Sequence, residues 1–302
     1  MKNQKAAILL ALLAVLLWSS VATSFKIALR GLSPFQLIFI AALVSQVFFF
    51  LVLVVRGKLR LLFSMQVNQF VQSAMQGFLN PFLYYLILFE AYSLNPAQVT
   101  QALNMVWPIT LALLSVPLLG QKISWRNLWA ILLSFAGVVF ISAQGSLDGF
   151  GKTNTTGAVL ALSSSIIWSL YWILSTKDKR DKLFVLFWNF AFGLIYLLIY
   201  SLFSSEAVFS FQFDRYFGAA VYVGMFELGI TYIVWIYALH KSENNAVTGN
   251  FIFLTPFLSL VFIYFILNET IYATTFIGLS FILLGIFIQQ LKRKPGKLSS
   301  LS

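Results

Sequence analysis

The residue best suited to chemistry in this sequence is a carboxylic acid, Glu227, which lies near the middle of an apolar run at 216–239. A carboxyl group in hydrocarbon is costly, so it should face the interior of a helix bundle or a water-filled cavity. There it can bind a substrate amine or carry a coupling proton. The alternative is a structural carboxyl that is hydrogen-bonded to a neighbouring helix. We therefore treat Glu227 as a candidate for substrate binding and for coupling.

Helical spacing adds further candidates around this carboxyl group. Steps of three and four residues place Gly224, Thr231 and Trp235 on the same helix face as Glu227. The members of a matching stripe in the run at 70–91 are Gly77, Asn80, Tyr84 and Leu88. Both stripes carry a small residue, a polar residue and a hydroxyl group at the same heights, which predicts a central site between the two helices.

Three side-chain amides complete the expected polar lining. Gln101 and Asn104 lie in the run at 97–119, and Asn250 lies in the run at 246–267. Amides pair with donors and acceptors alike, which suits a zwitterionic substrate, but they also join membrane helices to one another. Both interpretations stay open on the sequence alone.

Prolines interrupt the same two runs. Pro108 and Pro256 fall mid-run at matching positions, and each removes a backbone hydrogen bond and clashes with the preceding turn. We expect a kink at each, which serves either as a symmetric hinge or as a static bend. At the start of the run at 97–119, Asn95 is the expected N-cap and Pro96 is the expected first helical residue. The free backbone N–H groups there could receive a carboxylate.

Aromatic residues make up 17% of the chain. Most of them should pack in the core or against lipid, as any bulky apolar side chain does. Seven stand out because they lie near polar positions inside the apolar runs: Trp18, Trp107, Trp168, Tyr171, Trp172, Tyr232 and Trp235. Five aromatic residues are expected to line a cavity, either for an apolar side chain or for a cation held by ring faces. These five are Trp18, Tyr84, Trp107, Trp168 and Trp235.

The elements that must position these side chains are membrane helices. Of the 302 residues, 60% are hydrophobic and 10% are charged, whereas a soluble domain has about 45–50% apolar and about 25% charged residues. This composition excludes a soluble enzyme, a disordered chain and a fibrous protein. Ten continuous apolar runs are long enough to cross a bilayer. They span 6–29, 35–55, 70–91, 97–119, 125–143, 156–176, 183–203, 216–239, 246–267 and 274–291.

Basic residues indicate the orientation of these helices. The net charge is +11, and with the N-terminus inside, 16 of the 20 Lys and Arg residues fall on the inner side. The four outer ones are Lys26, Arg30, Lys152 and Arg215. Topology rather than nucleic-acid binding explains such a bias. We expect the protein in a bacterial-type inner (plasma) membrane, with both termini in the cytoplasm. We expect Lys26 to snorkel to water at the outer end of its helix.

A weak internal repeat divides the chain into two halves. Trp18 matches Trp168 at an offset of 150, and Pro108 matches Pro256 at an offset of 148. In between, Gly77, Tyr85 and Ala91 match Gly224, Tyr232 and Ala238 at an offset of 147. Each copy has five helices, an odd number, so the two copies must cross the membrane in opposite directions.

The expected fold is therefore an all-α polytopic membrane protein with ten transmembrane helices as two inverted five-helix repeats. We expect the first repeat at 1–144, a linker loop at 145–157, the second repeat at 158–292 and a cytoplasmic tail at 293–302. Inverted repeats of this kind build alternating-access transporters around a midplane site.

This architecture resembles the drug/metabolite transporter superfamily. Trp18-Ser19 in the first run and Ser33-Pro34 at the start of the second are similar to its pattern, and Leu267-Asn268-Glu269 is similar to its EamA-type repeats. Two features depart from that pattern: the second run has no Arg, and Gln121 stands where the second copy has Glu269. The resemblance implies export or exchange of small metabolites such as amino acids, while other branches handle cationic drugs, nucleotide-sugars or sugar phosphates.

The function expected from these features is secondary active transport by alternating access, with export or exchange of amino acids or similar small metabolites. The alternatives are an exporter of lipophilic or quaternary cations and, in another class, a channel. No Gly-rich loop ending in Lys-Ser/Thr supports ATP use, and no nucleophile–base set supports an enzyme. With one His and no Cys, we expect no metal and no cofactor.

The expected partners are a small-molecule substrate and the lipid bilayer, without nucleic acid. Small residues seven apart, Ala130 with Gly137 and Gly278 with Gly285, permit close helix contact. That contact can lie within the chain or between two chains, so the sequence allows a monomer or a homodimer.

Overall fold

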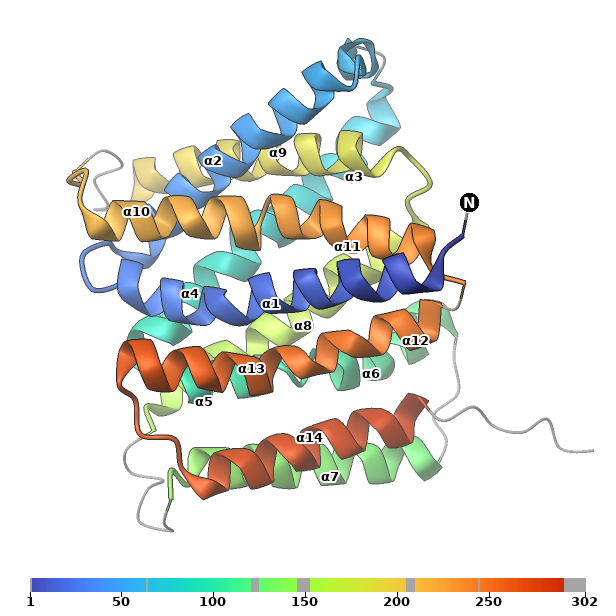
Figure 1. Ribbon diagram of the computed structural model, residues 1–302. Coiled ribbons are helices and arrows are strands. Elements are labelled where there is room, and N and C mark those ends of the chain that lie inside the picture. The colour runs from blue at the N-terminus through green and yellow to red at the C-terminus, as the bar shows by residue number, and fades with distance from the viewer. Residues whose placement is uncertain are drawn as a thin grey trace, which may run out of the picture.

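The computed structural model describes residues 2–63, 65–120, 125–145, 153–204, 210–243 and 245–290. These residues form an all-helical bundle (Figure 1), as the sequence predicts. The first repeat contains α1 (Gln4–Ala28), α2 (Pro34–Val55), α3 (Val67–Gly77), α4 (Tyr84–Leu94), α5 (Ala97–Asn104), α6 (Trp107–Leu119) and α7 (Trp125–Ser142). The second contains α8 (Thr155–Lys177), α9 (Lys182–Phe203), α10 (Arg215–Tyr222), α11 (Ile230–Lys241), α12 (Asn245–Asn250), α13 (Thr255–Phe262) and α14 (Ala273–Gln290).

Four of the ten predicted helices are interrupted. The pairs α3–α4, α5–α6, α10–α11 and α12–α13 each form one predicted helix. Short π-helical segments join α3 to α4 (Phe78–Leu83) and α10 to α11 (Val223–Glu227), and α12 meets α13 through a 3₁₀ segment (Phe251–Leu254). Within the described residues, seven helical stretches are long and apolar enough to cross a bilayer. Two shorter apolar helices, Trp129–Ser142 and Ala273–Ile288, lie within α7 and α14.

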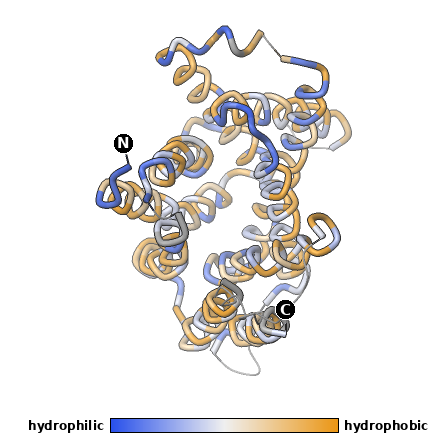
Figure 2. The backbone as a smooth tube through the Cα atoms, turned by 90° about the vertical axis from the view of Figure 1, so that its right-hand side faces the viewer, coloured by the Kyte–Doolittle hydropathy of each residue, from blue (hydrophilic) through white to orange (hydrophobic). Residues whose placement is uncertain are grey.

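The ends of the bundle define two faces. Asn3 donates its backbone N–H to the carbonyl of Lys241 (2.8 Å), so the start of α1 and the end of α11 lie together. We call this end, on the right in Figure 1, the N-terminal face, and the other end the opposite face. Seen along the helices in Figure 2, hydrophobic residues predominate on the helices, while the N-terminal segment is hydrophilic. The expected tail at 293–302 and most of the expected linker lie outside the described residues.

The contacts between helices follow an approximate two-fold pattern. Helix α1 packs on α11 as α8 packs on α4, and α1 packs on α13 as α8 packs on α6. In the same way α2 packs on α10 as α9 packs on α3, while α2 with α9 and α7 with α14 pair across the two halves. Exchanging the halves converts each contact into its partner, as expected for two copies of one five-helix unit.

An ion pair secures the N-terminal face where α8 meets α9. Arg180 Nη2 lies 2.6 Å from Asp178 Oδ2, and Arg180 also donates to Ser73 Oγ (2.9 Å) and the carbonyl of Gln69 (3.0 Å) on α3. Burial by itself raises the pKa of the Asp178 carboxyl, but the hydrogen bonds and charge of Arg180 outweigh it and lower the pKa below its usual value. Asp178 therefore stays ionised and ties three helices together.

Small residues bring α7 and α14 into close contact, side by side at the lower edge of Figure 1. A Cβ atom on Gly137 would clash with the backbone oxygen of Gly278 and lie 2.9 Å from Cγ1 of Ile282. On the other stripe, a Cβ atom on Gly285 would clash with Ser134 and lie 2.6 Å from the carbonyl oxygen of Ala130. The two small-residue stripes therefore pack against each other within one chain.

We predict that Gly137→Val destabilises the protein by about 1–3 kcal/mol, because the side chain must push α7 away from α14. Thermal unfolding in detergent measures the effect. Gly218→Val is the matched control, since no atom lies within 4 Å of a Cβ at that helical glycine. Equal melting temperatures for the two variants would contradict the close α7–α14 contact.

Candidate functional site

A cavity of about 670 Å³ lies between the two halves. Its walls come from α1, α4, α5 and α6 of the first half and from α8, α11, the α12–α13 segment and α14 of the second. The lining residues are Trp18, Val21, Ala22, Phe25, Tyr84, Leu88, Tyr92, Gln101, Asn104, Met105, Trp107, Trp168, Trp172, Glu227, Tyr232, Trp235, Gly249, Asn250, Ile252, Phe253, Thr255 and Phe287. A concave, largely apolar site with a few polar groups is typical of small-molecule binding.

Glu227 reaches this cavity from a π-helical turn. It is the last residue of the segment Val223–Glu227, ahead of Gly229, whose φ of −111° and ψ of −94° interrupt the helix. The turn is supported from α2, because Ser45 Oγ donates to the carbonyl of Gly224 at 2.7 Å. In hydrocarbon a distorted turn must find such internal partners for its backbone, and π-turns are frequent at functional sites.

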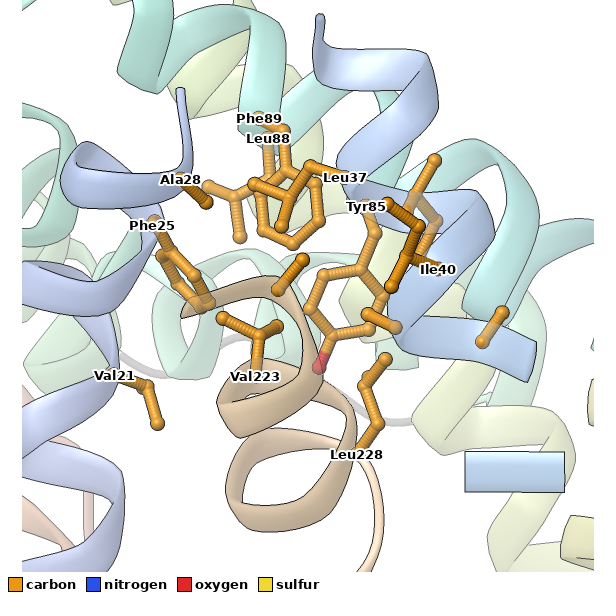
Figure 3. Close-up of a cluster of buried hydrophobic side chains, with 14 of the residues drawn as sticks. Val21, Phe25, Ala28, Leu37, Ile40, Tyr85, Leu88, Phe89, Val223 and Leu228 are labelled. Atoms are coloured by element: carbon orange, nitrogen blue, oxygen red, sulfur yellow. The ribbon is translucent and has the colours of Figure 1, made fainter. Parts of the chain in front are cut away.

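Among the described residues, the carboxylate of Glu227 has one side-chain donor, the hydroxyl of Tyr85, at 2.9 Å from Oε1. Tyr85 is fully buried, and Figure 3 shows its hydroxyl directed toward the segment that carries Val223 and Leu228. Trp18 Nε1 donates to the backbone carbonyl of Glu227 at 3.4 Å. No Lys, Arg or His is among the described lining residues. Glu227 therefore places an acidic group in the cavity without a basic neighbour in the described lining.

Aromatic rings line two walls of the cavity, and the repeat relates these walls. On one wall, Trp18 contacts Tyr232 edge-on and Trp235 at a tilt, with ring centroids 5.9 and 5.6 Å apart. On the other, Trp168, the repeat equivalent of Trp18, stacks on Tyr84 at 4.7 Å. Trp172 extends this second wall between Trp168 (6.1 Å) and Trp107 (6.3 Å). Such rings suit an apolar or planar group, or a cation against a ring face.

The amides lie at different depths of the cavity. Asn104 donates to Ser164 Oγ at 2.8 Å and accepts from the Tyr84 hydroxyl at 3.3 Å, so it is held in place between α4 and α8. Gln101 is nearly buried closer to the opposite face, with 8% of its surface exposed. Asn250 is exposed near the N-terminal face.

The burial of its lining residues indicates that the cavity is closed toward the opposite face and open toward the N-terminal face. Phe25 and Tyr92, the lining residues nearest the opposite face, are 3% and 2% exposed. Trp172 and Trp235, nearer the N-terminal face, are only partly buried, and Asn250 is exposed. A small molecule would therefore enter from the N-terminal face in this conformation.

Nine of the eleven candidates named from the sequence line the cavity, and two do not. The nine are Trp18, Tyr84, Gln101, Asn104, Trp107, Trp168, Glu227, Trp235 and Asn250. Asn80 is 1% exposed in its own π-helical turn, with φ −147° and ψ 118°, and lies outside the lining. Thr231 is fully buried and donates to the carbonyl of Phe226.

The π-turns explain both differences. An extra residue in a turn rotates everything after it around the helix axis, so regular steps of three and four no longer apply across it. After Glu227 the lining continues at Tyr232 and Trp235 instead of Thr231. In the first half the regular spacing starts only after the break, at Tyr84, Leu88 and Tyr92.

The candidates omit Tyr85, Tyr92, Trp172 and Tyr232. Tyr85 holds Glu227 in place, and the other three line the cavity. One signal was available, because Tyr85 and Tyr232 match each other in the internal repeat. A tyrosine retained at the same height in both copies marks the centre of the bundle better than helical spacing does.

The prolines lie where the helices break. Helix α5 ends at Asn104 and α6 begins at Trp107, with Pro108 in its first turn. Helix α13 begins at Thr255, with Pro256 in its first turn. The first turn of a helix tolerates proline because its N–H groups lack intrahelical partners. Each proline therefore starts a half-helix, and the break lies directly before it.

Comparisons with known proteins agree with this architecture. The model of the EamA-like transporter family matches residues 5–143 and 155–289. An uncharacterized transporter of Archaeoglobus fulgidus is 28% identical over 297 residues, covering 96% of this chain and 99% of that protein. The uncharacterized transporter YvbV of Bacillus subtilis is 26% identical over 226 residues, covering 74% of this chain and 72% of its own.

Two further likenesses are more distant. The aromatic amino acid exporter YddG of Ancylobacter novellus is 28% identical over 100 residues, 33% of this chain and 35% of that protein. A solved crystal structure with 19% identity superposes with a TM-score of 0.64 and covers 95% of this chain and 97% of its own, which shows a shared fold. With both halves matched by the family model, the chain belongs to the EamA-like transporter family of the drug/metabolite transporter superfamily and is a membrane transporter rather than an enzyme.

Proposed function

We propose that the protein is a secondary transporter that exports or exchanges amino acids or similar small metabolites across the inner membrane by alternating access. One observation carries the proposal: a carboxylate, Glu227, faces an aromatic cavity between two halves related by the repeat. Glu227 binds the substrate amine or carries the coupling proton. Its position at the meeting point of the halves lets both sides of the membrane reach it in turn.

Recognition of an amino acid divides into three parts. The carboxylate of Glu227 receives the ammonium group. The amides of Gln101, Asn104 and Asn250 serve the substrate carboxylate, and the walls around Trp18 and Trp168 enclose its side chain. The partial likeness to an aromatic amino acid exporter supports the same substrate class.

Lipophilic or quaternary cations are the second candidate substrates. The described lining has a carboxylate and no basic residue, so a zwitterion would bring a carboxylate without a cationic partner. A monocation would instead neutralise Glu227 and lie against the aromatic faces. The two classes differ in charge, which a transport assay resolves.

The proposed cycle uses the helix breaks. Pro108 and Pro256 lie beside the breaks in the α5–α6 and α12–α13 helices, and these breaks act as a pair of hinges. We propose that the N-terminal face is cytoplasmic, with both termini there, because most basic residues lie on that side. An open cavity on that face then loads substrate from the cytoplasm, as an exporter requires.

We propose that the chain has two repeats, at 1–144 and 158–292, and that the protein functions as a monomer or a homodimer. The small-residue stripes of α7 and α14 are used within the chain. A dimer would therefore need another surface.

We predict that Glu227→Gln abolishes exchange of the transported substrate, or makes it independent of pH, while the protein still folds. The amide keeps the shape of the side chain but removes its charge and its proton. The measurement is uptake of labelled amino acids and of quaternary amines into proteoliposomes. Glu90→Gln, an exposed carboxyl on α4, is the matched control. An unchanged rate and pH dependence in the Glu227 variant would contradict the proposed role.

We predict that Tyr85→Phe raises the half-saturation concentration of transport by at least about threefold, because Glu227 loses its side-chain donor. The ring and its packing remain, so the melting temperature should change little. Tyr196→Phe is the control, since that hydroxyl bonds the carbonyl of Ala74 and lies outside the cavity lining. Equal kinetics in the two variants would show that Tyr85 does not position Glu227.

A further inference from the structure

The corner between α4 and α5 lies at the opposite face, next to the buried lining residues Tyr92 and Gln101. Helix α4 ends at Leu94 and α5 begins at Ala97, with only Asn95 and Pro96 between them. A helix end leaves carbonyl groups without partners and a helix start leaves N–H groups without partners. Here the two sets lie next to each other, so the corner offers a negative and a positive helix pole at one place.

Lys26 binds the negative pole. Its ammonium group donates to the carbonyls of Tyr92 (2.8 Å) and Asn95 (3.1 Å), at the end of α4. The sequence predicts that Lys26 snorkels to water; in the structure it is partly buried, and its ammonium group donates to the backbone of a neighbouring helix. The preceding residue, Phe25, packs its ring against Tyr92 at 5.2 Å. Helix α1 is thereby attached to the corner by the hydrogen bonds of the Lys26 ammonium group and by the ring contact of Phe25.

Glu269 binds the positive pole. Its carboxylate accepts from the backbone N–H groups of Ala97 (2.9 Å) and Gln98 (3.4 Å), at the start of α5. The sequence predicts Asn95 as the cap of this helix, but Pro96 takes that place and Asn95 pairs with Asn154. The N–H groups expected to be free for a carboxylate are occupied by one from the other half of the chain.

The loop that carries Glu269 is tied to the same helix start by side chains. Gln98 Nε2 donates to the carbonyl of Thr270 at 2.8 Å, and Thr275 Oγ1 donates to Gln98 Oε1 at 2.8 Å. Lys26 and Glu269 attract each other electrostatically but form no direct ion pair. Each holds one pole of the corner, one from α1 and one from the loop before α14.

At the two positions that the repeat relates to Lys26 and Glu269, the sequence has no charged side chain. The offset of 150 places Thr176 where the first half has Lys26, and the offset of 148 places Gln121 where the second half has Glu269. The hydroxyl of Thr176 bonds the carbonyl of Ile173 in its own helix at 2.9 Å. Gln121 lies outside the described residues, and its amide has no charge. The two halves therefore differ in charge at these two positions.

We propose that Lys26 and Glu269 are positioning residues of transport, a latch that favours closure at the opposite face and so leaves the cavity open to the N-terminal face. The proposal rests on the alternating-access function above. Opening the opposite face requires α5 to move away from the loop before α14, which breaks the bonds of Glu269. Without the latch, the equilibrium between the two conformations shifts toward the one that is open to the opposite face, by the free energy of those hydrogen bonds.

The chain has no native cysteine, so single reporters can measure this balance directly. L88C reports the cavity wall near the opposite face, where Leu88 is 3% exposed, and N250C reports the mouth at the N-terminal face. Each reporter is reacted with a membrane-impermeant thiol reagent added to one side of oriented vesicles. In the parent protein, N250C should react rapidly from the N-terminal face and L88C slowly from the opposite face.

In the E269Q or K26M background, we expect L88C to react about threefold to tenfold faster from the opposite face than in the protein without these substitutions. We also expect N250C to react more slowly from the N-terminal face. If either variant merely removed a helix cap, it would loosen the bundle and speed the reactions of L88C and N250C together. The latch is therefore overturned by parallel acceleration, or by no change in either reporter.

The control is E90Q, which removes the carboxyl of an exposed residue of α4 that does not bind the corner. It should leave the reaction rates of L88C and N250C unchanged. Because K26M acts on one pole and E269Q on the other, the proposal stays testable if either variant fails to fold. Thiol labelling needs no substrate. A reciprocal shift without transport of any tested compound would support the latch and reject the proposed substrate class, whereas normal transport without a shift would reject the latch alone.

Discussion

Backbone polar groups in a bilayer must find partners inside the protein, and this constraint accounts for the site and for its closure. A helix that bends or breaks in hydrocarbon exposes carbonyl and N–H groups that water cannot satisfy. At the turn that carries Glu227, the hydroxyl of Ser45 supplies one of the missing partners. At the corner between α4 and α5, Lys26 and Glu269 supply them with full charges. Side chains from neighbouring helices thus determine where the chain can depart from a straight helix.

The two halves share one architecture but not one chemistry. The breaks in the α3–α4 and α10–α11 helices fall at equivalent places, and Asn80 and Glu227 occupy equivalent positions in them. Asn80 is buried outside the cavity, whereas Glu227 lines it beside Tyr85. A symmetric scaffold therefore presents one asymmetric carboxylate, so a substrate can bind in a defined orientation while the scaffold keeps two similar states.

The sequence predicts most of the fold and much of the cavity, for identifiable reasons. Continuous apolar runs locate the ten helices, and the offset near 150 pairs Trp18 with Trp168, which both line the cavity. Regular helical spacing across Glu227 predicts Thr231 on the lining, but the π-turn there rotates Tyr232 into its place. The sequence predicts that Lys26 reaches water, since nothing in its own helix reveals the carbonyl groups that it binds at the end of α4. Local turns and long-range caps are the features that a single sequence does not specify.

The central claim is that one cavity around Glu227 is exposed to the two sides of the membrane in turn. Counterflow in proteoliposomes tests it most directly, with a panel of labelled amino acids, quaternary amines and nucleotide-sugars at equal internal and external pH. The account predicts saturable uptake of one class that is accelerated when the same compound is loaded unlabelled on the other side. Flux that neither saturates nor responds to the compound on the other side would contradict it.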